Sequence, residues 1–383
     1  MTPPRQHPPV ASVGPPSGLA QETEVPAAIM TRVQDYLGDL RGARARKTLL
    51  ALANGVRLFR AWCEVHGHPW LPTTADALRG FIAHIGDQPF RRRTIAGKII
   101  ETGPVAAASL RQYLWAVGVL HRAAELPDPT KSGRVALAVD AFERAHRVRQ
   151  KQAPALTRAI SDTILAGIEA SIAEAQSDDA PVSVYDLRDQ ALILTWRDTM
   201  ARVSEVVALR WEDIQPNPLD QSGSIEIRRS KTDQRGEGHM RFLSARTMAA
   251  LAAWRTAHER IISDASPKQQ QAIAAAHREP DALPADSAVF IGVHRAGITP
   301  LSTTAAVQKL NERAVDAGVL RRFSGHSIRV GTAQDLIAGG QEIAAIAQAG
   351  GWKDVKMVLR YGERLLTDRS AVARAEAERS DLS

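Results

Sequence analysis

The sequence predicts a mainly α-helical protein of two domains with one small antiparallel β-hairpin. Apolar residues recur at helical spacing through most of the 383-residue chain. The alternation typical of strands is clear only between residues 222 and 244, in SGSIEIRRSKTDQRGEGHMRFLS. A polar stretch containing proline divides the chain near residue 150, and at this length each of two domains can bury a core of its own.

The elements follow in order along the chain. Residues 1–27 are crowded with proline and lack the order of a secretory signal, so we expect a disordered tail. Residues 28–148 are predicted to form a compact domain of four or five helices, on stretches such as LLALANGVRLFRAW and SLRQYLWAVGVLHRA. We expect a linker at 149–156, because Pro154 disfavours a continuing helix, and a second mainly helical domain at 157–383.

Charge and cysteine content limit the possible partners and the compartment. Residues 28–150 carry 19 Lys and Arg against 10 Asp and Glu, a net charge of +9, whereas the whole chain carries +7. Such an excess favours a polyanionic partner, although alone it also fits a solvated surface. The single cysteine, Cys63, excludes an internal disulfide and a cysteine-based zinc cluster. No apolar run approaches the ~20 residues of a membrane-spanning helix, so we expect a cytoplasmic protein without a membrane partner.

Four short stretches of the second domain contain candidate site residues. Two of them, ARVSEVV and GHSIRVG, place an arginine three residues from a glutamate or a histidine, and a histidine and arginine at a helix start suit a phosphate. Each stretch alone also fits an ordinary structural role, such as a surface ion pair, a capping histidine, a core aromatic residue or a solvated lysine. The candidate residues are Arg202, Glu205, Lys231, His326, Arg329, Trp352 and Tyr361.

Together and in this order, the stretches resemble the tyrosine recombinase (phage integrase) family. The family pattern is Arg-x-x-Glu, a hairpin lysine, His-x-x-Arg, a tryptophan or histidine, and a tyrosine. The resemblance extends more loosely to FRAWCEVHGHPWLP and LHRAAELPDPT, so it covers nearly the whole chain after the tail. Met200 and Ala201 stand where many relatives have a glycine turn, and Trp352 where many have histidine. The resemblance implies a C-shaped clamp on DNA, with a helical N-terminal DNA-binding domain and a catalytic domain.

The resemblance also implies cleavage and rejoining of DNA through a 3′-phosphotyrosyl intermediate, without metal, ATP or another cofactor. Tyr361 would be the nucleophile, and a phenol with a pKa of about 10 needs a base or nearby cations to lose its proton. Arg202 and Arg329 would meet the non-bridging oxygens, whose charge grows in the transition state. Lys231 would protonate the departing 5′-hydroxyl as general acid.

Three roles stay open on the residues alone. His326 suits either proton transfer or a hydrogen bond to phosphate, and Glu205 would orient either Arg202 or the histidine. Trp352 would donate its indole N–H to phosphate and pack against its neighbours.

The family resemblance further implies assembly on DNA. Tyrosine recombinases act as four protomers on two inverted-repeat sites, so we expect a homotetramer associated with the nucleoid. Residues 369–380 are either a helix donated to a neighbouring protomer or a solvated tail. Candidate base-reading residues, which fit core packing almost as well, are Ser302, Thr303, Thr304 and Gln308. Candidate phosphate contacts, which would otherwise solvate a loop, are Arg91, Arg92, Arg93 and Lys98.

Other functions compete with recombination. A type IB topoisomerase has similar arginine, lysine and tyrosine chemistry, but the N-terminal domain argues against it. A catalytically silent sequence-specific DNA-binding protein would not need all seven candidate residues. A helical interaction protein with fortuitous motifs would leave the basic excess of the first domain unexplained.

Overall fold

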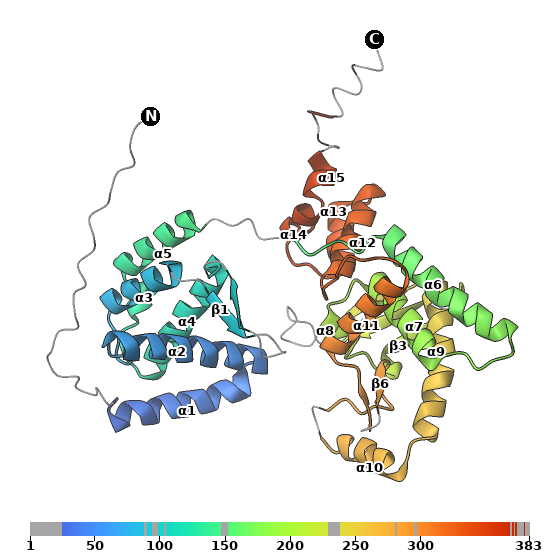
Figure 1. The fold of residues 1–383 in the computed structure, drawn as a ribbon, viewed down its shortest axis with the longest axis horizontal. Helices are drawn as coiled ribbons and strands as arrows, with labels where there is room; N and C mark the ends of the chain where they lie inside the picture. The colour runs from blue at the N-terminus through green and yellow to red at the C-terminus, as the bar shows by residue number, and fades with distance from the viewer. Residues whose placement is uncertain are drawn as a thin grey trace. The chain divides into compact units, whose positions relative to one another are not determined.

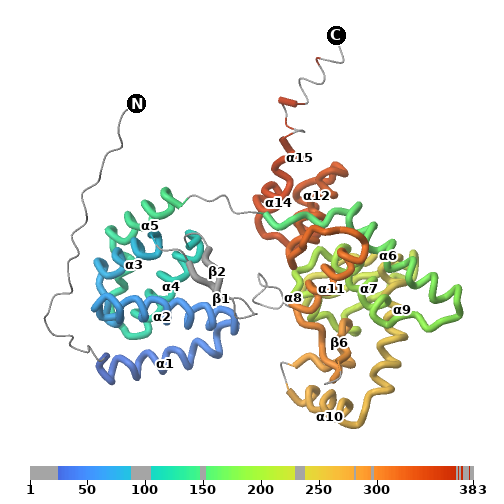
Figure 2. Tube along the Cα trace, in the orientation of Figure 1, coloured from blue at the N-terminus to red at the C-terminus, as the bar shows by residue number. Residues whose placement is uncertain are grey.

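Helices dominate the computed structural model of the protein, and short strands pair into small antiparallel sheets (Figure 1). The structure describes residues 25–87, 105–146, 152–228, 238–279, 282–294 and 297–367, a few residues between 370 and 379, and the backbone of strands at 90–93 and 99–102. The chain divides into two compact units, Met1–Gln150 and Lys151–Ser383, traced in Figure 2. The predicted fold class, mainly α with a small antiparallel hairpin, is confirmed.

An aromatic core holds the helices of the first unit together. The rings of Phe59 and Phe81 meet edge to face with centroids 5.1 Å apart, and Leu78 and Leu110 are fully buried beside them. Cys63 is buried in the same core. The helices described in this unit are α1 (Ala27–Ala43), α2 (Arg46–His66), α3 (Ala75–Asp87), α4 (Ala107–Ala123), the 3-10 turn η1 (Pro129–Lys131) and α5 (Gly133–Ala145).

A strand pair in the first unit was not predicted. β1 (Phe90–Arg93) runs antiparallel to β2 (Ile99–Thr102), where the sequence suggested a loop. The pattern FRRR has no alternation of apolar and polar residues, so the usual strand signal is missing. The backbone of Arg91, Arg92 and Arg93 lies in β1, while their side chains and Lys98 lie outside the described residues.

The second unit is organised around α7 (Val184–Thr199). Eleven of its 16 residues are buried. One of them, Trp196, belongs to the same hydrophobic core as Trp254 of α9. A helix buried on most sides is typical of the interior of a large domain, and its buried charges are paired, as Arg188 is with Asp189. The other helices described in this unit are α6 (Arg158–Ser177), α8 (Val203–Val206), the 3-10 turn η2 (Trp211–Asp213), α9 (Ala245–Ser263), α10 (Pro267–Ala276), α11 (Thr303–Asp316), α12 (Ser327–Ala338), α13 (Ile343–Gly350), α14 (Lys356–Tyr361) and α15 (Glu363–Thr367).

The predicted hairpin is part of a three-stranded sheet in the order β3 (Ile214–Pro216), β4 (Gly223–Ile227) and β5 (His239–Leu243). Ile225 and Ile227 point to the core, whereas Met240 and Phe242 are exposed. The segment between β4 and β5 at 229–237, which carries Lys231, lies outside the described residues. A second hairpin, β6 (Ile291–His294) with β7 (Gly297–Pro300), was not predicted.

The chain enters the second unit along α12. Leu156 is fully buried, its backbone N–H donates to the Ser327 carbonyl at 3.0 Å, and its carbonyl accepts from Arg197 Nη1 at 3.2 Å. Gly331 of α12 faces this backbone so closely that a Cβ would overlap the Leu156 carbonyl. None of the helices in the described part of the chain is both long enough and apolar enough to cross a bilayer.

Candidate active site

Tyr361 ends α14 and lies in a small core formed by the C-terminal helices. The side chain is only 6% exposed and belongs to the same buried cluster as Val330 and Val358. The Tyr361 carbonyl accepts hydrogen bonds from Gln334 Nε2 at 2.9 Å and from Gln152 Nε2 at 3.3 Å. These bonds hold the tyrosine main chain, while the phenol hydroxyl interacts with a different residue.

The hydroxyl partner of Tyr361 is His326, whose Nε2 lies 2.8 Å from the phenol oxygen. Burial lowers the pKa of His326, and the cations Arg329 and Arg202 lower that pKa further. Burial raises the pKa of Tyr361, although Arg329, a hydrogen bond with Trp352, and Arg202 act in the opposite direction. The site therefore places a neutral imidazole beside a protonated phenol, a pair in which a proton can pass from oxygen to nitrogen.

Arg329 is a buried cation, only 1% exposed, in the first turn of α12. Its Nη1 donates to the Met200 carbonyl, and its Nη2 donates to the Gly350 carbonyl at 3.0 Å. Its Cζ lies 4.4 Å from the centroid of a Trp352 ring, in cation–π contact. Burial, and then Arg202, lower the Arg329 pKa to about 10, so the guanidinium stays charged at neutral pH.

Arg202 is the N-cap residue of α8 and is bound to Glu205 in two ways. The Arg202 backbone N–H donates to Glu205 Oε2 at 2.8 Å, and Arg202 Nη1 donates to Oε1 at 2.7 Å. The arginine side chain is 22% exposed and that of Glu205 only 7%, so the carboxylate fixes a partly accessible guanidinium. The turn before α8 is made by Met200, whose φ of 49° supplies the left-handed conformation that glycine usually provides.

The structure thus brings most of the predicted catalytic residues into one cluster from α8, α12, the turn after α13, and α14. The members of this cluster are Arg202, Glu205, His326, Arg329, Trp352 and Tyr361. The seventh, Lys231, lies outside the described residues. Within the described ranges, no group of three or more His, Cys, Asp or Glu side chains has an arrangement suited to holding a metal ion.

Comparison with known proteins identifies the family. Residues 168–365 match the model of the phage integrase family. The chain belongs to this family. The matched region includes every predicted catalytic residue, Lys231 among them, and the predicted resemblance to tyrosine recombinases is confirmed.

Relatives of this tyrosine recombinase match it over most of their length. It is 26% identical over 356 residues to the recombinase Cre of Escherichia phage P1, covering 87% of this chain and 89% of Cre. It is also 26% identical to the tyrosine recombinase XerD of Rhizobium meliloti strain 1021, covering 88% and 91% of the two chains. The solved structure of the Tn1549 transposon integrase with circular intermediate DNA has the same fold, with a TM-score of 0.52, 14% identity and coverage of 92% and 99%.

The predicted base-reading residues of this recombinase lie at the start of α11 and are not buried. Ser302 caps α11 by accepting from the Ala305 N–H at 3.1 Å, and Gln308 Nε2 donates to Glu312 at 2.8 Å. Thr303 is partly buried and Thr304 is exposed, so core packing does not account for these side chains.

Sequence reasoning missed one cation of the site, Arg241 of β5. Burial lowers the pKa of Arg241, with Glu205 opposing and Arg202 adding to that effect, so its guanidinium is electrostatically coupled to the Arg202–Glu205 pair. The sequence carried no signal for it, because apolar alternation would turn Met240 and Phe242 toward the core and Arg241 away from it, whereas the structure has Met240 and Phe242 exposed.

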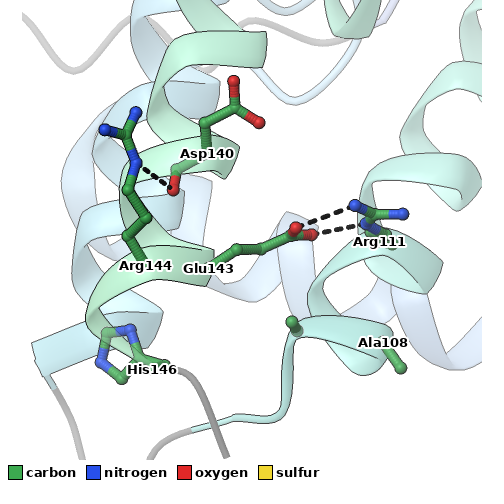
Figure 3. Close-up of a pocket in the computed structure, with 7 residues that line it drawn as sticks. Ala108, Arg111, Asp140, Glu143, Arg144 and His146 are labelled. Carbon is green, nitrogen blue, oxygen red and sulfur yellow. Dashed lines mark hydrogen bonds and ion pairs between the residues drawn. The ribbon is translucent and has the colours of Figure 1, made fainter.

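A separate pocket of about 590 Å³ lies in the first unit of the recombinase, between α4 and α5 (Figure 3). Arg111 of α4 is bound to Glu143 of α5 through two hydrogen bonds, at 2.5 Å and 2.8 Å. These two charged side chains face each other across the pocket and neutralise each other. None of the predicted catalytic residues lines it.

Proposed function

We propose that the chain is a site-specific DNA recombinase that cleaves and rejoins DNA with Tyr361 as nucleophile. The observation that carries this proposal is the 2.8 Å contact between His326 Nε2 and the Tyr361 hydroxyl, beside the buried Arg329. A phenol is a weak nucleophile at neutral pH, and a hydrogen-bonded base with nearby cations is the usual way to activate it.

In the proposed step, the Tyr361 oxygen attacks the scissile phosphorus while His326 accepts the phenol proton. The bond from phosphorus to the 5′-oxygen breaks, and the protein becomes linked to the DNA 3′-phosphate. Arg202 and Arg329 stabilise the non-bridging oxygens. Fixed guanidinium groups in a partly buried site interact strongly with the negative charge that develops on these oxygens in the transition state. The Trp352 indole N–H donates a further hydrogen bond to phosphate.

Lys231 protonates the departing 5′-oxygen as general acid, which leaves a free 5′-hydroxyl. The phosphotyrosyl bond conserves the energy of the cleaved phosphodiester, so attack by a 5′-hydroxyl can rejoin a strand without ATP. We propose no cofactor or metal for either step. Glu205 serves to hold Arg202 in place, in keeping with their two hydrogen bonds.

The DNA partner we propose is a duplex with inverted repeats, bound at two copies by a homotetramer. The exposed or partly exposed side chains of α11 support contacts to base edges from Ser302, Thr303, Thr304 and Gln308. The basic excess of residues 28–150 supports phosphate contacts in the first unit, with Arg91, Arg92, Arg93 and Lys98 as candidates. We propose the domains 28–148 and 157–383, joined by 149–156, as the two DNA-binding parts of a clamp.

Covalent trapping tests the proposal. Wild type and Tyr361→Phe are incubated with nicked suicide duplexes drawn from the DNA that flanks the gene, and protein–DNA adducts are resolved on a denaturing gel. A wild-type adduct that is absent from Tyr361→Phe supports tyrosine cleavage and locates the site. Tight sequence-specific binding by both proteins without an adduct would instead indicate a silent DNA-binding protein. Equal adducts from both proteins would place the nucleophile elsewhere.

A further inference from the structure

Arg241 joins the hairpin sheet to the C-terminal end of α13. The residue lies in β5 opposite the fully buried Ile225 of β4. Its Nη1 donates to the Gln348 carbonyl at 2.9 Å, in the last turn of α13. Because the carbonyl end of a helix carries partial negative charge, a guanidinium is stabilised there.

The turn after α13 is shaped to receive this guanidinium. Gly351 adopts a left-handed φ of 64°, and a Cβ at that position would overlap Arg241 Nη2. The Gly351 N–H donates to the same Gln348 carbonyl, at 3.0 Å, that Arg241 binds. Residue 351 is therefore glycine both for its backbone conformation and for the space that the arginine occupies.

This turn leads directly to Trp352, which contacts two proposed catalytic groups. The Trp352 backbone N–H donates to the Ala347 carbonyl at 2.9 Å. The turn therefore fixes the position of the Trp352 backbone, from which the indole extends. The ring then lies 4.4 Å from Arg329 Cζ and 5.6 Å from the Tyr361 ring, measured to centroids. A shift of the turn would move the indole relative to both groups.

Two arginines from separate elements, β5 and α12, hold the same helix end. Arg329 Nη2 donates to the Gly350 carbonyl at 3.0 Å, while Arg241 binds the Gln348 carbonyl. Arg329 already has the tryptophan and the Met200 carbonyl as further partners. Arg241 is thus the connection between the strands that flank segment 229–237 and the turn that carries Trp352.

We propose that Arg241 is a positioning residue that fixes the turn from Gly350 to Trp352 and thereby holds the indole against Arg329 and Tyr361. The reaction it serves is the proposed strand cleavage, so the inference rests on that function. Small displacements of groups around a reacting phosphate cost on the order of 100-fold in rate. Arg241→Ala should therefore slow adduct formation at saturating DNA by roughly 10- to 100-fold, with little change in DNA affinity.

The first test needs no DNA. The full chain, which has seven tryptophans, is labelled with 5-fluorotryptophan, and the ¹⁹F signal lost in Trp352→Phe is assigned to Trp352. In Arg241→Ala this signal should shift or broaden, while it should stay in place in Arg260→Ala, a matched loss of an exposed arginine from α9. An unmoved Trp352 signal in Arg241→Ala would overturn the inference. If that variant does not fold, Arg241→Gln is judged by the same signal.

The second test is a double-mutant cycle of trapping rates on the nicked duplexes. If Arg241 acts through Trp352, Arg241→Ala combined with Trp352→Phe should be no slower than the slower single variant. Rates that multiply, or an Arg241→Ala rate equal to that of Arg260→Ala, would overturn the role. A shifted Trp352 signal together with no wild-type adduct would refute the cleavage chemistry while leaving the positioning contact established.

Discussion

Gly331→Ala is a sharp test of how α12 is held in place. In an isolated helix this substitution would stabilise by about 1 kcal/mol, because alanine is the better helix former. Here a Cβ would lie 2.7 Å from the Thr157 nitrogen and closer still to the Leu156 carbonyl, whereas ordinary contacts begin at 3.4 Å. The clash is with backbone, so no side-chain rotation relieves it.

The magnitude follows from what must move. Retreat of the 156–157 backbone breaks the Leu156 bonds to the Ser327 carbonyl and from Arg197, at about 1 kcal/mol each. It also withdraws part of the fully buried Leu156 side chain, whose complete burial is worth about 1.5–3 kcal/mol. After subtracting the helix-propensity gain, we expect the free energy of unfolding to fall by about 2–3 kcal/mol.

Urea unfolding of the full chain measures this change, with Gly167→Ala as the matched control. Gly167 is an exposed residue within α6, and the nearest atom to its added Cβ would be 4.0 Å away. That variant should gain about 0.5–1 kcal/mol. If Gly331→Ala were as stable as Gly167→Ala, the tight packing of residues 156–157 on α12 would be refuted.

Four further predictions concern the site. Because protonated His326 cannot accept the phenol proton, adduct formation should fall as pH drops through the His326 pKa, which lies below the ordinary histidine value of 6.5. A pH–rate profile of His326→Gln should lack this fall. The lowered His326 pKa also makes a contribution to the free energy of unfolding that is complete above pH 6.5 and is lost as pH falls through the pKa of His326 in the folded protein. Acid titration of the stability of wild type and of His326→Gln detects this loss. Arg329→Lys should slow trapping by about 100-fold, since one ammonium cannot replace a fork bound to two carbonyls, and an unchanged rate would contradict its role. Glu205→Gln should slow trapping by about 10-fold by loosening Arg202, and should lower the urea-measured free energy of unfolding by about 1–3 kcal/mol.

The sequence predicted the elements whose signals are local. The alternation of Ile225 and Ile227 predicted the hairpin, and the three-residue spacing placed Arg202 and Glu205 on one helix face, where the structure has them as an ion pair. β1 escaped because FRRR lacks the apolar alternation of a strand, although its backbone pairs with β2. β6 and β7 are only four residues each, too short for periodicity to separate from a loop.

The site was predictable as a set of residue types but not as a set of contacts. No sequence pattern indicates that Gln152 would reach the Tyr361 carbonyl, since the two residues lie 209 positions apart. Arg241 was missed for a related reason, because its partner is a main-chain carbonyl of α13, which any residue at position 348 would provide.

Carbonyl anchoring of Arg329 has a consequence for protein engineering. The Met200 and Gly350 carbonyls that hold the guanidinium belong to the main chain, so they persist whatever side chain occupies position 200, provided that the turn keeps its conformation. Directed evolution could therefore randomise side chains around this cation in search of new target sequences without removing its anchors. Libraries that spare the glycine at 350 should retain active clones more often than libraries that vary it, because a Cβ there would overlap Trp352.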